Sequence, residues 1–121
     1  MKGDLGMSSY IDKFIKLSVK AFDAQELGNS RIVNSCNNDI IKIAQKLYQL
    51  DKIIELVPLL YHEHVSVRYN AAVKLLPFET VLSEAVLEEL ASKKGTLTYF
   101  SAQLMLKEWR KGNLKFDYYK K

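Results

Sequence analysis

A repeat of about 30 residues is the feature that most constrains how this chain can fold. Shifting residues 57–76 by that distance lays them on residues 87–106, with apolar and aromatic residues in register. The equivalent pairs are Val57 and Leu87, Leu60 and Leu90, Tyr69 and Tyr99, Ala72 and Ala102, and Leu76 and Leu106. Repeats of this length are supersecondary units that stack and bury a shared core. The repeat therefore predicts two stacked units of the same kind.

Apolar residues recur every three to four residues through most of the chain, which predicts amphipathic helices. The helices are expected at residues 9–27, 30–50, 51–60, 65–76, 80–92 and 96–111. Breaks between these runs are expected near Gly28, Leu50, residues 61–64, Pro77 and Gly95. The sequence thus predicts an all-α fold, a stack of about six helices in antiparallel hairpins, with residues 9–50 as a diverged pair that covers one end of the stack.

The length and composition predict one domain, because 121 residues, of which 48% are hydrophobic, suffice for one packed core. We expect a flexible N-terminus over residues 1–8, a single helical domain over residues 9–116 and a short basic tail over residues 117–121. The single cysteine excludes an internal disulfide. No apolar leader and no apolar run of membrane-spanning length is present. These features predict a cytoplasmic protein without membrane association.

The chain resembles HEAT repeats, in which a helix with paired leucines precedes a Val-Arg-x-x-Ala-Ala-x-x-Leu helix. The matching residues are Leu59, Leu60, Val67, Arg68, Ala71, Ala72, Leu75 and Leu76. Together with Pro77 and residues 101–112, they resemble a family of short bacterial HEAT-like (armadillo-type) domains catalogued as a domain of unknown function. The resemblance covers residues 9–116, least distinctly in the N-terminal third. It implies an α-α superhelix in which Arg68 hydrogen-bonds an acidic group or carbonyls of an adjacent layer, and it leaves the activity open.

Residues that suggest catalysis or metal binding are few. His62, Glu63 and His64 are adjacent, but alternate side chains of a turn need not converge, and the chain has no third histidine. Cys36 falls in the apolar stripe of its helix with Ile40, which favours a place in the core. No phosphate-binding loop, catalytic paired-carboxylate signature or serine elbow is present. We predict a protein without enzymatic activity, catalytic residues, metal or cofactor; an enzyme would need the histidine cluster or Cys36 to be active.

The net charge of +4 is concentrated in residues 107–121, which carry six basic and two acidic residues. The rest of the chain is balanced and creates no global field that would attract phosphates. Nucleic-acid binding would have to rely on a few cations, Lys74, Lys107, Arg110 and Lys111. We keep it as the alternative function. An affinity that falls steeply with salt would indicate it.

Protein binding is the preferred function, because tyrosines recur at matched repeat positions beside amides and cations. The second helix of each predicted pair would line a concave face. The candidate residues on that face are Tyr69, Asn70, Lys74, Tyr99, Gln103, Lys107 and Arg110. A polar stripe in residues 30–50 is either solvated or a further binding surface, and its candidates are Arg31, Asn34 and Asn38. One concrete version of this function is an immunity protein that inhibits a bacterial toxin.

Overall fold

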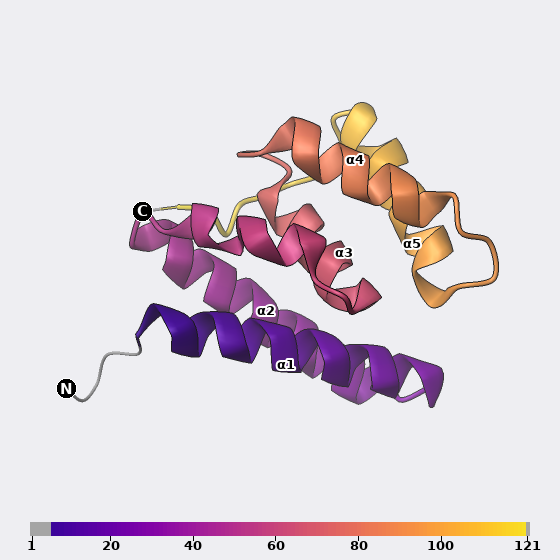
Figure 1. The fold of residues 1–121 in the computed structure, drawn as a ribbon, viewed down its shortest axis with the longest axis horizontal. Helices are drawn as coiled ribbons and strands as arrows, with labels where there is room; N and C mark the ends of the chain where they lie inside the picture. Colours follow the sequence, from indigo (N-terminus) through magenta and orange to yellow (C-terminus); the bar gives the residue numbers. More distant parts are fainter. Residues whose placement is uncertain (1–5, 121) are drawn as a thin grey trace. The chain divides into compact units, whose positions relative to one another are not determined.

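The computed structural model describes residues 6–120, and this part of the chain is all-α, with no strand (Figure 1). Its elements are α1 (Met7–Glu26), α2 (Ser30–Gln49), the 3-10 helix η1 (Ile53–Tyr61), α3 (Val65–Leu75), α4 (Thr80–Ala91) and α5 (Leu97–Arg110). The prediction of six helices is confirmed, with boundaries within two residues of the expected ones. None of these helices is both long enough and apolar enough to cross a membrane. The predicted flexible N-terminus falls mostly on residues 1–5, which lie outside the described residues.

Three helices end in the same hydrogen-bonded motif. The residue after each C-cap is left-handed, with φ of 73° at Gly28, 59° at Asp51 and 76° at Gly112. In each case the next N–H donates to a carbonyl five residues back, as in the 2.7 Å bond from Lys52 to Leu47. Asp51 therefore closes α2, and the prediction that the next helix begins at Asp51 is wrong. Aspartate tolerates this conformation better than most residues with a Cβ atom.

The third helix is of the 3-10 type over its whole length, which the sequence analysis did not predict. Pro58 lies inside it. Proline has no N–H to donate, and its ring disfavours the α conformation of the preceding residue. A continuous α-helix is therefore interrupted at this position, and the tighter 3-10 geometry takes its place.

The chain forms two compact units. Among the described residues, unit 1 combines residues 6–55 with residues 118–120, and unit 2 comprises residues 56–117. In unit 1, α1 and α2 pack along each other as a hairpin around a core that includes Phe14, Ile40 and Leu47. Ser18 is also fully buried in this core, where its hydroxyl donates a 2.8 Å bond to the Phe14 carbonyl. A single domain over residues 9–116 would require the two units to pack together as one body. That part stays a prediction.

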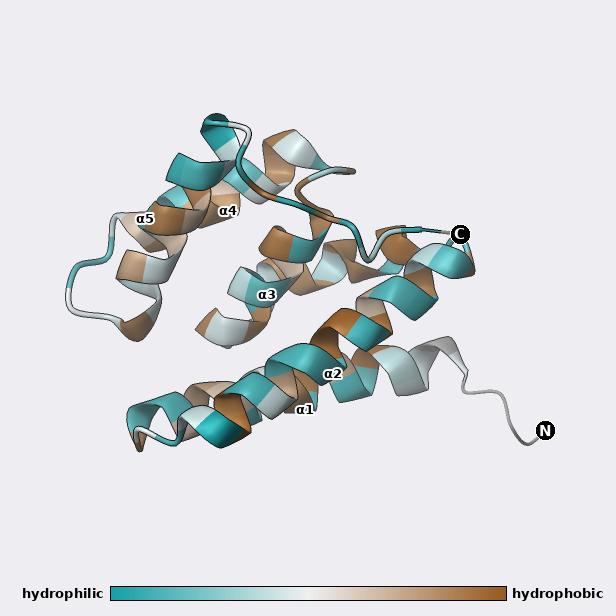
Figure 2. Cartoon of the chain, turned by 180° about the vertical axis from the view of Figure 1, so that it is seen from behind, coloured by the Kyte–Doolittle hydropathy of each residue, from teal (hydrophilic) through white to brown (hydrophobic). Residues whose placement is uncertain are grey.

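In unit 2, α4 packs against both α3 and α5, and α3 also contacts α5. Figure 2 shows both brown and teal segments along α3 and α5, as in amphipathic helices. Ala71 and Ala72 of α3 are completely buried, which confirms that they belong to the core. Small side chains at such positions let neighbouring helix backbones approach closely.

The C-terminal tyrosines belong to unit 1. The centroid of the Tyr119 ring lies 5.2 Å from that of the Tyr48 ring, near the end of α2. It lies 4.6 Å from the centroid of the Tyr118 ring. Burial raises the pKa of Tyr118 to about 12 and raises that of Tyr119 further. Of the predicted basic tail over residues 117–121, the aromatic pair thus packs on unit 1, whereas Lys120 is exposed.

Candidate partner-binding surfaces

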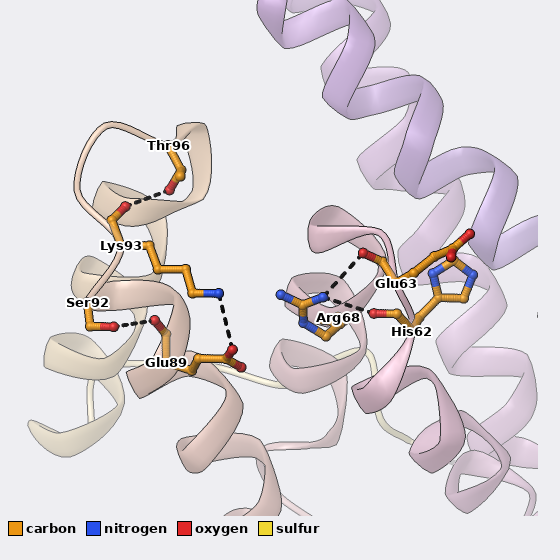
Figure 3. A network of polar contacts seen from close by, with 7 residues as sticks. All are labelled: His62, Glu63, Arg68, Glu89, Ser92, Lys93 and Thr96. Carbon is orange, nitrogen blue, oxygen red and sulfur yellow. Dashed lines mark hydrogen bonds and ion pairs between the residues drawn. The ribbon is translucent and has the colours of Figure 1, made fainter.

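The turn before α3 is built on two imidazoles. His62 Nδ1 accepts a 3.0 Å bond from the backbone N–H of His64, and His64 Nδ1 accepts a 3.2 Å bond from the N–H of Ser66, capping the helix. Arg68 then reaches back over the turn. Its guanidinium donates to the carbonyls of His62 (2.9 Å) and Glu63 (3.4 Å) (Figure 3). Arg68 thus bonds carbonyls, as one of the two alternatives had it, but the expectation that they belong to an adjacent layer is wrong, because they lie in the turn before its own helix.

The residues considered for catalysis, His62, His64 and Cys36, are held in the turn before α3 or in the core. In both histidines Nδ1 acts as an acceptor within the turn. No group of three or more histidine, cysteine or acidic side chains within the described residues could hold a metal ion. Cys36 is 3% exposed, as expected of a core cysteine. The prediction that the protein is not an enzyme rests on the sequence pattern and stays a prediction.

The candidates on α3 are largely covered. Tyr69 and Asn70 are half-buried, and Lys74 is only 9% exposed. Burial raises the pKa of Tyr69 to about 12 and lowers the pKa of Lys74 to about 8. These shifts have one cause, because removal from water disfavours the charged form of either group. In this structure α3 therefore presents little polar surface to a partner.

The candidates on α5 differ from one another in exposure. Gln103 and Lys107 are exposed, whereas Tyr99 is half-buried, with its ring 5.0 Å from that of Phe100. Arg110 is on the surface, but its guanidinium lies 2.5 Å from a Glu88 oxygen and 3.8 Å from Glu84. The hydrogen bond to Glu88 is the main reason why the pKa of Arg110 is raised. Only Gln103 and Lys107 of these four are open to a partner.

A polar cluster joins α4 to α5. The spacing of Glu84 and Glu88 predicts a solvated acidic pair, but both carboxylates contact the next helix. Glu84 accepts a 2.7 Å hydrogen bond from the indole N–H of Trp109, and both glutamates pair with Arg110. The Trp109 ring also packs edge-on against Phe116, with 6.1 Å between ring centroids. This cluster fixes the side of α5 that faces α4.

Replacing Glu84 with alanine is expected to lower the free energy of unfolding by about 1–2 kcal/mol, because the half-buried indole N–H of Trp109 loses its acceptor. Trp109→Phe removes the donor of the same hydrogen bond. Urea unfolding followed by circular dichroism, applied to both single variants and the double variant, would give the coupling energy between Glu84 and Trp109. A coupling energy near zero would contradict a stabilising role for this bond.

The face of α5 that points away from α4 carries an exposed apolar pair. Phe100 is 75% exposed and Leu104 is 60% exposed. Residues at positions 100, 104, 107 and 111 lie on one face of a helix, because their spacings are four, three and four. Exposed Lys107 and Lys111 therefore continue the line of the apolar pair, and exposed Gln103 lies beside it. We call Phe100, Gln103, Leu104, Lys107 and Lys111 the α5 face.

Sequence reasoning missed Phe100 and Leu104. The repeat drew attention to Tyr99, Ala102 and Leu106, and only the last two of these are buried. A signal was nevertheless present, because α5 has more large apolar residues than one buried stripe can hold. Phe100 and Leu104 are separated from the stripe of Ala102 and Leu106 by about half a helical turn.

The third group of candidates, Arg31, Asn34 and Asn38, lies on α2. All three are exposed on one face of this helix, which Asn29 caps by accepting a 3.2 Å bond from the Ile32 N–H. They belong to unit 1, whereas the α5 face belongs to unit 2. Whether this stripe is merely solvated or a binding surface stays open, as it was from the sequence.

The chain matches no protein-family model, no curated protein and no solved structure. The resemblance to HEAT-like domains therefore stays a prediction from the residues quoted for it.

Proposed function

We propose that this chain is a non-catalytic, HEAT-like helical module that binds a partner protein through the α5 face. The HEAT-like part of the proposal is supported by burial at repeat-equivalent positions. Ala72 and Ala102 are both 0% exposed, and Leu60 and Leu90 are 1% and 0% exposed. Equal burial at these two pairs supports stacked repeats, although Val57 is half-buried where its equivalent Leu87 is 0% exposed.

The observation that carries the binding proposal is the exposure of Phe100 and Leu104 on adjacent turns of α5. Interface centres are apolar and rich in aromatic residues, and a few residues supply most of the binding energy, so Phe100 is the expected anchor and Leu104 extends its apolar surface. Exposed Lys107 and Lys111 border the pair, so the α5 face fits a partner with an apolar spot beside acidic groups. That the partner is a toxin, and the chain an immunity-type inhibitor, stays a prediction from the sequence.

The α5 face favours a protein partner over nucleic acid. Of the four cations considered for nucleic acid, Lys74 is buried and Arg110 is paired with glutamates. The remaining two, Lys107 and Lys111, border the exposed apolar pair. Binding of a phosphate backbone depends on cations and would gain little from Phe100 and Leu104.

Replacing Phe100 and Leu104 together with serine is expected to weaken the partner complex by at least about tenfold, since truncation of even one hot-spot residue costs roughly 2 kcal/mol or more. The measurement is affinity capture from native cells, followed by titration of the purified partner. Val81→Ser is the matched control, because Val81 is 82% exposed on α4 and lies outside the α5 face. Equal binding by both variants would contradict the proposal, as would a ligand that proves to be nucleic acid.

A further inference from the structure

A groove runs between α1 and α2 in unit 1. Its volume is about 500 Å³, which lies within the range of pockets that hold small ligands or single large side chains. Tyr10 and Leu17 of α1 and Ile43 of α2 give it an apolar lining. Ile43 is buried, and the other two are half-buried, so their exposed parts face the groove. The groove can therefore accept an apolar group.

The remaining lining of the groove is charged. Lys13 and Lys16 of α1 and Lys42 of α2 contribute three ammonium groups, and Asp39 of α2 contributes one carboxylate. All four residues are exposed, and none forms an ion pair with another described residue. The groove thus carries a local charge of +2, although residues 1–106 as a whole are balanced.

We propose that this groove binds an acidic peptide segment of a partner protein, which inserts one large apolar side chain between α1 and α2. Charge complementarity argues for an acidic occupant, because three unpaired lysines surround the apolar lining. The apolar lining argues for a peptide over nucleic acid, since Tyr10, Leu17 and Ile43 can bury an apolar side chain, whereas binding of a phosphate backbone depends on cations alone. Asp39 can accept a peptide N–H group. The site is independent of the α5 face, which lies on the other unit.

The test uses the full chain and a fluorescein-labelled peptide of aspartates and glutamates around one central phenylalanine. Fluorescence anisotropy gives its affinity for the parent and for a charge-reversed groove variant, Lys13→Glu with Lys42→Glu. We expect this variant to bind at least about tenfold more weakly, because two attractive charges become repulsive. The matched control is Lys20→Glu with Lys46→Glu, which reverses two exposed lysines of the same helices outside the groove. The control should bind within about twofold of the parent.

Two further probes separate the contribution of the apolar lining to binding from that of charge. A peptide with serine in place of the central phenylalanine should bind more weakly, and single-stranded DNA of equal charge should bind more weakly than the phenylalanine peptide. The inference is overturned if the acidic peptide does not bind, if groove and control variants lose affinity equally, or if DNA binds more tightly. The variant with serines at Phe100 and Leu104 should keep its affinity for the peptide, so failure at the α5 face and failure at the groove are distinguishable.

Discussion

Ala72→Leu is expected to lower the free energy of unfolding by about 1–3 kcal/mol, because the larger side chain must be inserted into a close-packed helix contact. Ala72 is 0% exposed and belongs to α3, which packs against α4 and α5. The protein has one tryptophan, Trp109 of unit 2, so its fluorescence in urea reports the unfolding of the unit that contains the substitution.

Ala85→Leu provides the matched control, since it makes the same change at an exposed position of α4. Its unfolding free energy should stay within about 0.5 kcal/mol of that of the parent. An Ala72→Leu variant that unfolds at the same urea concentration as the parent would show that α3 is not in close contact with its neighbours.

Lys74→Met is expected to raise the free energy of unfolding at pH 7 by up to about 3 kcal/mol. Burial lowers the pKa of the Lys74 ammonium from 10.5 to about 8, so at pH 7 the folded protein keeps a charged group out of water. Methionine has a similar shape and no charge. Lys74 also takes part in a contact, and loss of that contact offsets part of the gain.

The stability difference between Lys74→Met and the parent is expected to depend on pH. Between pH 8 and 10.5 the folded protein has released the Lys74 proton while the unfolded chain still holds it. Stability of the parent therefore rises with pH across this window, and its difference from Lys74→Met should shrink. The comparison is best made from pH 7 to 10, because the raised pKa of Tyr69, about 12, makes stability fall with pH above 10.

Lys94→Met is the control for the Lys74 experiment. Lys94 is exposed in the loop between α4 and α5, so its replacement should change stability by no more than about 0.5 kcal/mol at any pH in the range. A Lys74→Met variant that is less stable than the parent at pH 7 would mean that the contact made by Lys74 outweighs its desolvation.

The features that the sequence predicted are those encoded by neighbouring residues. Glycines mark the ends of α1 and α5, and Pro77 follows α3, because backbone conformation at these positions depends on the local residue type. The burial of Ala71, Ala72 and Cys36 followed from helical spacing. The cost of leaving a guanidinium without acceptors predicted that Arg68 would find a partner, but not that the partner is the turn before its own helix.

The candidate site was harder to predict, because it depends on how far each helix is rotated about its own axis. Trp109 and Glu84 are 25 positions apart, and their bond forms only when α5 presents one particular side to α4. The same rotation leaves Phe100 and Leu104 in solvent. Periodicity shows that α5 carries apolar residues on two opposite sides, but not which of the two sides is covered. The burial of Lys74 is likewise a property of the folded chain and not of its spacing.

The packing of Tyr119 against Tyr48 has a consequence for the order in which the molecule can assemble during synthesis. The two rings belong to unit 1, yet the whole of unit 2 lies between them in the sequence. Nascent chains fold from the N-terminus onward as they emerge from the ribosome. The α1–α2 hairpin can therefore form early, but its last aromatic contact must wait until all of unit 2 has been translated. Prior folding of unit 2 would shorten the flexible segment that this contact has to close, and so reduce its entropic cost.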